Sequence, residues 1–143
     1  MTTDHHLKLD QQICFSLYAA SREIIKLYKP ILDPHRLTYT QYLAMMVLWE
    51  EEKITVKRMG KRLHLDSGTL TPLLKKLEAM GHVSRYRSPE DDRVVIVELT
   101  DQGSQLKQNM LDVPIQMASQ VQLPIEEALQ LKKQLDHLLE QFN

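Results

Sequence analysis

The sequence predicts a mainly α-helical fold with a small β-wing. Apolar residues recur at steps of three and four over most of the 143-residue chain, which is the spacing of amphipathic helices. Residues 54–99 differ: two short helical stretches joined by a tight turn precede two strand-like runs. We therefore expect one domain over residues 1–143, in which a helix-turn-helix and its wing (38–99) are flanked by long helices at 8–29 and 104–143.

A long amphipathic helix is expected over residues 9–28, because its apolar side chains fall on one face. Lys29 and Pro30 follow and are expected to end it. Cys14 and Tyr18 are four residues apart and therefore lie on one side of this helix. Cys14 is expected beyond the first turn, where the helix dipole has little effect.

Two further helices have recognisable caps. Thr38 is expected to cap a helix over residues 39–49, whose apolar side chains we interpret as hydrophobic core. Thr55 is expected to cap a helix that ends at residue 63. The apolar face of this second helix is formed by Val56, Met59 and Leu63, and its other face by Lys57, Arg58, Lys61 and Arg62.

The next predicted helix has a polar face of short hydroxyls and cations. Asp66 and Ser67 offer oxygens to cap it, and Gly81 is expected to stop it near residue 80. Its apolar face is formed by Leu70, Leu73, Leu74 and Leu77, and the outward side chains are Ser67, Thr69, Thr71, Lys75 and Lys76. Such outward side chains suit base edges and phosphates. Pro72 is expected to make this helix start late or bend.

Residues 83–87 and 93–99 are β-branched or alternating runs, which predict a two-stranded hairpin. Arg85, Arg87 and Arg93 lie on or beside this wing. At its tip, the sequence Asp91-Asp92-Arg93 places carboxylates where one of them can hold an arginine aimed at a minor groove. The alternative is a solvated turn without a partner.

Beyond the wing, Thr100 is expected to open a helix that Pro114 kinks, and Pro124 to start a last helix. The flanking helices carry more apolar surface than one small core needs, so their surplus faces are expected to pack against a second copy. A two-fold homodimer places two reading helices about 34–36 Å apart and selects a pseudo-palindromic operator in double-stranded DNA.

The charge is divided unevenly, although the net charge is only −1. Residues 53–93 carry a local charge of +5 and the remainder −6, which favours an anionic partner for the basic segment. The chain has no long apolar run and no signal peptide, so we expect a cytoplasmic protein without a membrane partner. A single cysteine excludes an intrachain disulfide, and no spacing typical of a metal, cofactor or catalytic site occurs.

Residues 66–75 (DSGTLTPLLK) and the Asp91-Asp92-Arg93 tip, in this order of helices, resemble the MarR family of winged helix-turn-helix repressors. Residues 12–22, 28–30 and 37–43 are similar to its organic hydroperoxide resistance regulator (OhrR) branch. The resemblance covers essentially the whole chain. Many members of the branch have a second, resolving cysteine, which this chain lacks, so it resembles the one-cysteine type.

The resemblance implies that Cys14 is a peroxide-reactive thiol. It also implies that Tyr28 and Tyr39 donate hydrogen bonds to this thiol from the partner subunit, with Tyr18 nearby. The candidate DNA-binding residues, from the residues and the resemblance together, are Ser67, Thr69, Thr71, Pro72, Lys75, Lys76, Arg85, Arg87, Asp92 and Arg93.

The function expected is that of a dimeric, DNA-binding transcriptional repressor, not an enzyme, which needs no cofactor. Organic hydroperoxide acts as its inducer: the Cys14 thiolate attacks the peroxide, and the oxidised sulfur is capped by a low-molecular-weight thiol or a backbone nitrogen. The alternatives are a repressor released by a non-covalent phenolic or other small ligand, a thiol peroxidase, and a structural or protein-interaction module. Without the resemblance, a lone cysteine on an apolar helix is interpreted as a small buried hydrophobic residue.

Overall fold

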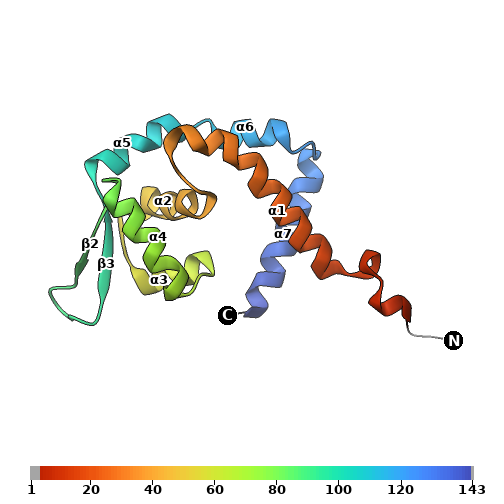
Figure 1. Ribbon diagram of the computed structural model, residues 1–143, viewed down its shortest axis with the longest axis horizontal. Helices are drawn as coiled ribbons and strands as arrows, with labels where there is room; N and C mark the ends of the chain where they lie inside the picture. The colour runs from red at the N-terminus through yellow and green to blue at the C-terminus, as the bar shows by residue number, and fades with distance from the viewer. Residues whose placement is uncertain (1–3, 143) are drawn as a thin grey trace.

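The protein is described by a computed structural model that covers residues 4–142. Residues 1–3 and 143, the ends of the expected domain, lie outside the described part. One lobe contains the sheet with α2, α3 and α4, while α1, α6 and α7 extend away from it (Figure 1). In chain order the elements are the 3-10 helices Asp4–Leu7 and Leu9–Gln11, α1 (Ile13–Leu32), the 3-10 helix Asp33–His35, α2 (Tyr39–Glu51), β1 (Lys53–Thr55), α3 (Val56–Leu63), α4 (Ser67–Ala79), β2 (Val83–Arg87), β3 (Val95–Leu99), α5 (Asp101–Met110), α6 (Val113–Gln120), α7 (Ile125–Leu139) and the 3-10 helix Glu140–Phe142.

Helix α1 differs from its prediction at both ends. Gln12 is extended (φ −95°, ψ 110°) and separates α1 from a 3-10 turn, so the expected start at residue 9 is wrong. Cys14 is consequently the second residue of α1, and its expected place beyond the first turn is also wrong. Pro30 lies inside the helix instead of ending it. The helix continues because Leu32, only 1% exposed, is anchored in the core, and the hydrogen bond that proline cannot donate is lost only in the last turn.

The predicted caps of α2, α3 and α4 are confirmed. Thr38 forms a capping box with Gln41, in which each side chain accepts a hydrogen bond from the other's backbone N–H. The Thr55 hydroxyl accepts from the backbone of the third residue of α3 at 3.1 Å. Asp66 Oδ1 accepts from Thr69 N at 2.7 Å. Helix α4 therefore starts directly after its cap, and a late start caused by proline is wrong.

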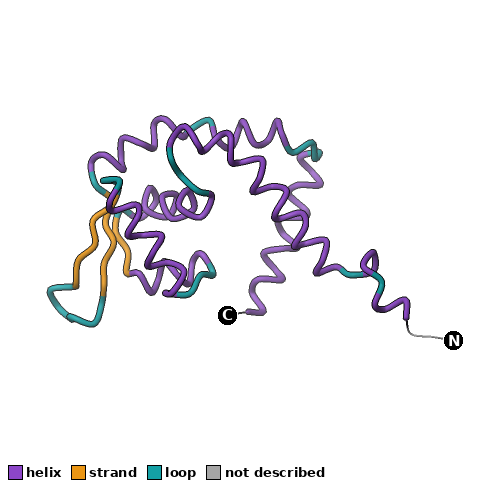
Figure 2. The backbone as a smooth tube through the Cα atoms, viewed as in Figure 1, coloured by secondary structure: helices purple, strands orange, loops and turns teal. Residues whose placement is uncertain are grey.

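The sheet has three strands in the order β1-β3-β2, both pairs antiparallel, so the expectation of a two-stranded ribbon is incomplete. The hairpin of β2 and β3 is confirmed. Strand β1 was missed because three residues are too short to display a period of two. In Figure 2 the strands occupy one corner of a molecule that is otherwise helical.

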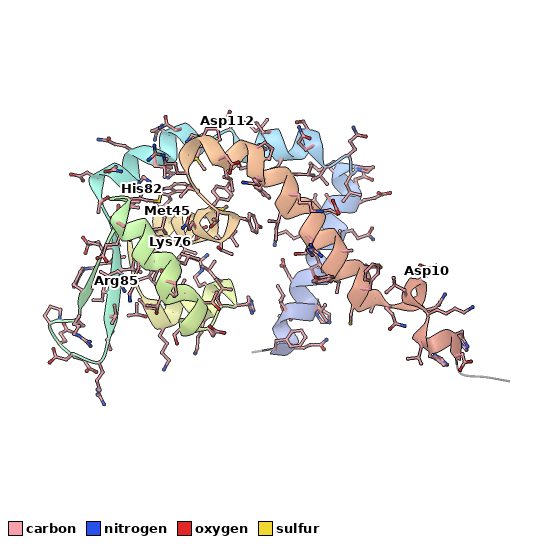
Figure 3. All side chains as sticks on the ribbon, viewed as in Figure 1. Asp10, Met45, Lys76, His82, Arg85 and Asp112 are labelled. Carbon is pink, nitrogen blue, oxygen red and sulfur yellow. The ribbon has the colours of Figure 1, made fainter. Side chains whose placement is uncertain are left out.

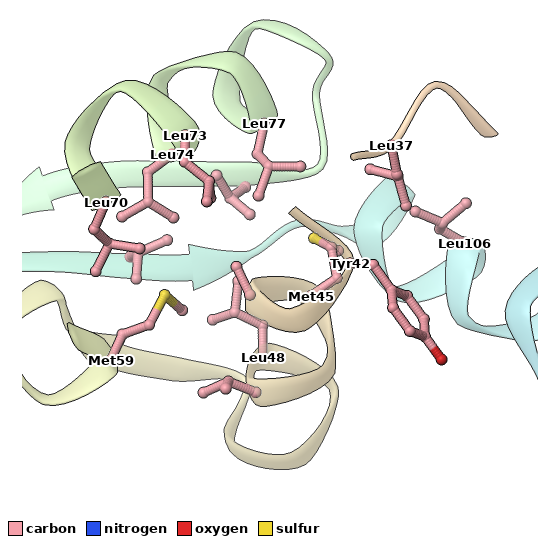
Figure 4. Close-up of a cluster of buried hydrophobic side chains, with 14 of the residues drawn as sticks. Leu37, Tyr42, Met45, Leu48, Met59, Leu70, Leu73, Leu74, Leu77 and Leu106 are labelled. Atoms are coloured by element: carbon pink, nitrogen blue, oxygen red, sulfur yellow. The ribbon is translucent and has the colours of Figure 1, made fainter. Parts of the chain in front are cut away.

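The core lies between α2, α4, the sheet and α5 (Figure 4). The predicted leucine face of α4 is buried throughout, and it packs with residues of the other elements: Tyr42, Met45, Leu48, Met59, Leu70, Leu73, Leu74, Leu77, Val97 and Leu106. Met110 and Val113 extend this core into α6, so much of the apolar stripe after residue 104 is covered within the chain. Pro114 occupies the first turn of α6, so it begins a separate helix where a kink was expected.

A large apolar surface remains uncovered. Helix α7 has no buried residue, and the N-terminal half of α1 is exposed except at Ala19, which is half-buried. The exposed apolar side chains of these helices and of the α6 region are Ile13, Phe15, Leu17, Tyr18, Ile24, Ile25, Leu111, Ile115, Leu123, Ile125, Leu129, Leu131, Leu138, Leu139 and Phe142. None of the helices within residues 4–142 combines the length and apolar composition needed to cross a bilayer.

His82 is a buried polar residue at the turn between α4 and β2. Its side chain is 7% exposed, and its Nδ1 has no hydrogen-bond partner within residues 4–142. Its backbone carbonyl accepts from Thr100 N at 3.1 Å, which ties the start of the wing to α5. Burial lowers the pKa of His82 from its usual value of 6.5, because the charged ring loses hydration.

We expect the protein to lose stability in acid through His82. A lowered pKa in the folded state means that the stability is fully present above about pH 6.5 and is lost as the pH falls through the folded-state value. Urea unfolding at pH 7.5 and 5.5 measures this loss, and His82→Gln should reduce it. His5→Gln, at an exposed position, is the matched control; an equal pH dependence in wild type and His82→Gln contradicts the assignment.

Candidate functional site

Helix α4 presents the polar face that the sequence predicts. Ser67, Thr69, Pro72, Lys75 and Lys76 are exposed, and Thr71 is half-buried. Figure 3 labels Lys76 on α4. The backbone N–H of Thr69 lowers the pKa of the Asp66 carboxyl, so the cap that sets the start of the helix stays ionised at neutral pH.

One groove joins this polar face to the wing. It is lined by four parts of the chain. The lining residues are Thr55, Val56, Lys57, Arg58, Gly60, Lys61 and Arg62 from the α3 region, His64, Leu65, Asp66, Ser67, Leu70, Thr71 and Leu74 from the turn and α4, Arg85, Arg93, Val94 and Val95 from the wing, and Leu139 and Phe142 from the end of α7 and the 3-10 helix after it. The charged side chains of the lining are cationic except for that of Asp66. A concave, cationic surface of this kind suits the convex, anionic surface of a nucleic acid.

Arg93 extends from the wing tip with 90% of its side chain exposed. Its Nε donates to Asp91 Oδ1 at 3.1 Å and its Nη2 to Asp91 Oδ2 at 3.2 Å, while its backbone N–H also donates to Asp91 Oδ1. This arginine lowers the pKa of the Asp91 carboxyl. Asp92 was expected among the DNA-binding residues, but the carboxylate that holds Arg93 belongs to Asp91. The spacing Asp-x-Arg in a turn was the available signal, since aspartate bonds the backbone two residues on.

Asp92 and Arg87 contact each other within the wing. The Asp92 carbonyl accepts from Arg87 Nη1 at 2.7 Å, so this contact uses the backbone of Asp92 and not its carboxylate. Arg87 is exposed and is the last residue of β2, just before the loop at the wing tip. The contact closes the loop that carries Arg93.

Arg85 is held against α4. Its Nε and Nη2 donate to Glu78 Oε1 at 3.3 and 3.1 Å, and its backbone N–H donates to Glu78 Oε2 at 3.1 Å. Only 21% of the Arg85 side chain is exposed. Figure 3 shows Arg85 on the strand beside α4. This pair fixes the wing relative to α4, a role that sequence reasoning missed because Glu78 and Arg85 lie on different elements.

Cys14 is exposed in the first turn of α1. Tyr18 lies one turn further on, where its hydroxyl accepts from Arg22 Nη1 at 3.2 Å and its ring lies 5.4 Å from the Arg22 guanidinium carbon. Tyr28 is fourteen residues beyond Cys14, which is about 21 Å along a helix. The structure therefore does not bring Cys14 and Tyr28 of one chain together.

Tyr28, Tyr39 and Tyr42 form an aromatic cluster between α1 and α2. The ring centroid of Tyr28 lies 4.6 Å from that of Tyr39 and 5.8 Å from that of Tyr42. Burial, assisted by the neighbouring phenols, raises the pKa of Tyr28 to about 12, and burial raises the pKa of Tyr39 in the same direction. Both phenols therefore keep their protons at neutral pH and can act as hydrogen-bond donors.

Comparison with known proteins agrees with this arrangement. The family described as transcriptional regulator SarA/Rot matches residues 26–110. The organic hydroperoxide resistance transcriptional regulator of Bacillus subtilis (strain 168) is 50% identical over 135 residues, which cover 94% of this chain and 92% of that protein. The chain belongs to this family of MarR-type regulators. It is therefore a DNA-binding transcriptional regulator and not an enzyme.

Solved structures support the same assignment. The structure of reduced AbfR bound to DNA has a TM-score of 0.80 and 35% identity, and the similarity covers 99% of both chains. AbfR is a protein of Staphylococcus epidermidis. The structure of disulfide-formed AbfR has a TM-score of 0.66 and 38% identity over 95% of this chain and 96% of that one. The predicted winged helix-turn-helix fold of this MarR-type regulator is thus confirmed.

Two neighbouring aspartates provide a matched test of the wing. Asp91→Asn should weaken binding to a duplex selected by the wild-type protein from a random pool, by about 2- to 10-fold, because an unrestrained Arg93 must be ordered on binding. Asp92→Asn should bind normally, since its carboxylate does not hold Arg93. Fluorescence anisotropy measures both affinities; equal effects of the two substitutions contradict the assignment.

Proposed function

We propose that this MarR-type regulator is a homodimeric repressor that senses organic hydroperoxides through Cys14 and releases its operator when Cys14 is oxidised. The observation that carries the proposal is an exposed lone cysteine at the N-terminal end of α1, in a chain half identical to a relative named for organic hydroperoxide resistance. The positive end of a helix dipole favours an anion there, and the thiolate is the reactive form of cysteine.

The homodimer follows from the uncovered apolar surface. A 15-residue helix is marginally stable by itself in water, and α7 has no residue buried by its own chain. The exposed N-terminal half of α1 adds to the same need for a partner. A second copy supplies an identical apolar surface, and a two-fold axis accounts for both helices at once. The proposed dimerisation segments are residues 8–29 and 104–143.

The dimer also supplies the phenols that Cys14 lacks. Because Tyr28 of the same chain lies about 21 Å away along α1, only Tyr28 of the partner subunit can reach the sulfur. Tyr39 stacks on Tyr28 and therefore accompanies it. Both phenols remain protonated at neutral pH, so they can donate hydrogen bonds that stabilise a thiolate. Tyr18 lines the same side of α1 as Cys14.

The chemistry proceeds by attack of the Cys14 thiolate on the distal peroxide oxygen. The O–O bond breaks, an alkoxide leaves and takes a proton to become an alcohol, and the sulfur becomes a sulfenic acid. The chain has one cysteine, so a low-molecular-weight thiol or a backbone N–H condenses with the sulfenic acid and releases water. Either product adds bulk or a new bond at the start of α1.

DNA is bound through the groove and through the exposed faces of α4 and the wing beside it. The proposed contacts to DNA are made by Ser67, Thr69, Thr71, Pro72, Lys75 and Lys76 of α4 and by Arg87 and Arg93 of the wing, with Asp92 and Arg85 in supporting positions. In a two-fold dimer two such surfaces lie about 34–36 Å apart, one turn of B-DNA, and match a pseudo-palindromic operator. Movement of α1 after oxidation changes this spacing. We propose that the protein acts in the cytoplasm, where it meets its DNA.

Replacing the sulfur tests the sensor. Cys14→Ser should bind the selected duplex with wild-type affinity and remain bound after cumene hydroperoxide treatment, whereas the wild type is released, because serine cannot form a sulfenic acid. A gel shift beside mass spectrometry of Cys14 on the same sample measures release and oxidation together. If peroxide releases Cys14→Ser as well, the sensing proposal fails, and release by a phenolic ligand alone supports the non-covalent alternative.

Removing the phenols tests the partner contact. Tyr28→Phe together with Tyr39→Phe should slow peroxide oxidation of Cys14 at pH 7 by about 10-fold or more, the factor that corresponds to 1.4 kcal/mol of lost thiolate stabilisation. Stopped-flow kinetics of thiol consumption measures the rate. Tyr42→Phe, in the same aromatic cluster, is the control and should oxidise at the wild-type rate. An unchanged rate in the double variant removes these phenols from the mechanism.

A further inference from the structure

Glu51, the last residue of α2, holds two arginines of α3. Its Oε1 accepts from Arg58 Nη1 at 2.6 Å, and its Oε2 accepts from Arg62 Nη1 at 2.7 Å. Glu50 supports it through an ion pair between its Oε2 and Arg62 Nη2, 2.8 Å apart. The Glu51 side chain is 21% exposed and the Glu50 side chain 63%, so Glu51 is the more protected of the two.

The two arginines would otherwise face DNA. Arg58 and Arg62 line the same groove as Ser67, Thr71 and Arg93. In a helix-turn-helix the first helix, here α3, crosses the phosphate backbone. A cation on that helix reads no base, because phosphate contacts carry no direct sequence information. Unrestrained, the arginines would add affinity for any DNA.

The position of Glu51 is unfavourable for an acid unless it has a partner. Helix α2 ends at Glu51, and the C-terminal end of a helix dipole is negative and disfavours carboxylates. The arginines offset this repulsion, and each of the two Glu51 oxygens is occupied by one of them. Lys57 and Lys61, on the same helix as the arginines, form no ion pair within residues 4–142. The restraint is therefore selective for Arg58 and Arg62.

We propose that Glu51 is a specificity-determining residue of this regulator: it competes with DNA phosphates for Arg58 and Arg62 and so limits binding to non-operator DNA. Binding to random DNA depends almost wholly on the number of phosphates neutralised. By holding two surface cations in ion pairs, Glu51 leaves discrimination to α4 and the wing. The inference depends on the groove being the DNA-facing surface, as proposed above.

Salt dependence measures the number of phosphate contacts directly. Each contact contributes about 0.9 to the slope of log K against log salt concentration. Release of both arginines should therefore steepen the slope for random DNA by up to about 1.8 per bound protomer. Over a fourfold range of salt this corresponds to up to about a 12-fold change. A purely structural role of Glu51 leaves the slope unchanged or flattens it.

The experiment uses reduced full-length protein, without peroxide, and fluorescence anisotropy from 50 to 200 mM salt. Glu51→Gln should bind a random duplex more tightly at low salt with a steeper slope, and its preference for the selected duplex should fall. Glu50→Gln is the matched control and should keep the wild-type slope, because Glu51 still holds both arginines. Adding Arg58→Gln and Arg62→Gln to Glu51→Gln should restore that slope.

A second variant makes the test independent of the folding of Glu51→Gln. Arg58→Gln with Arg62→Gln, in the presence of Glu51, should bind both duplexes with the wild-type slope, since these arginines are withheld from DNA. A flatter slope for this double variant, or an unchanged or flatter slope for folded Glu51→Gln, overturns the proposal. Arg93→Ala separates the two levels of inference: if it binds the selected duplex normally, the groove assignment itself fails.

Discussion

Burial of the leucine face of α4 is the constraint on which the helix-turn-helix and its wing depend. Leu70, Leu74 and Leu77 are fully buried and Leu73 nearly so, packed against α2 and the sheet. Because one face of the helix is buried in the core, the opposite face lies in solvent. Fully burying such a side chain contributes about 1.5–3 kcal/mol, which far exceeds the cost or gain of any exposed contact on α4. The polar face, which we propose contacts DNA, can therefore vary in sequence while its orientation stays fixed.

Carboxylates then fix the start of α4 and the positions of the arginine side chains around it. Asp66 fixes the start of α4, Glu78 fixes the wing through Arg85, and Asp91 orients Arg93. Glu51 holds Arg58 and Arg62 of α3. Exposed ion pairs of this kind contribute little to the free energy of unfolding, with a median of about 0–1 kcal/mol. Their consequence is geometric: they fix the positions of the cations that we propose contact DNA, within a chain whose net charge is only −1.

The sequence predicted those parts of the fold that depend on local chemistry. Periodicity located the buried face of α4, and the hydroxyl and carboxylate caps at Thr38, Thr55 and Asp66 set three helix starts correctly. Features that depend on tertiary contacts were missed. Strand β1 is recognisable only through its pairing with β3, and α1 passes Pro30 because Leu32 is anchored in a core formed by distant segments. The partners of the arginines were missed for the same reason, since they lie seven or more residues away or on other elements.

The distribution of burial along α1 determines how a change at Cys14 can reach DNA. The buried residue of α1 is Leu32, eighteen residues or about 27 Å along the helix from Cys14. Modification of the sulfur therefore leaves the hydrophobic core between α2, α4, the sheet and α5 intact. What surrounds the N-terminal half of α1 must lie outside this chain, because that half is exposed. In the proposed mechanism, a signal from Cys14 acts through the surface that covers α1, and it changes the distance between two DNA-binding lobes rather than the structure of either one.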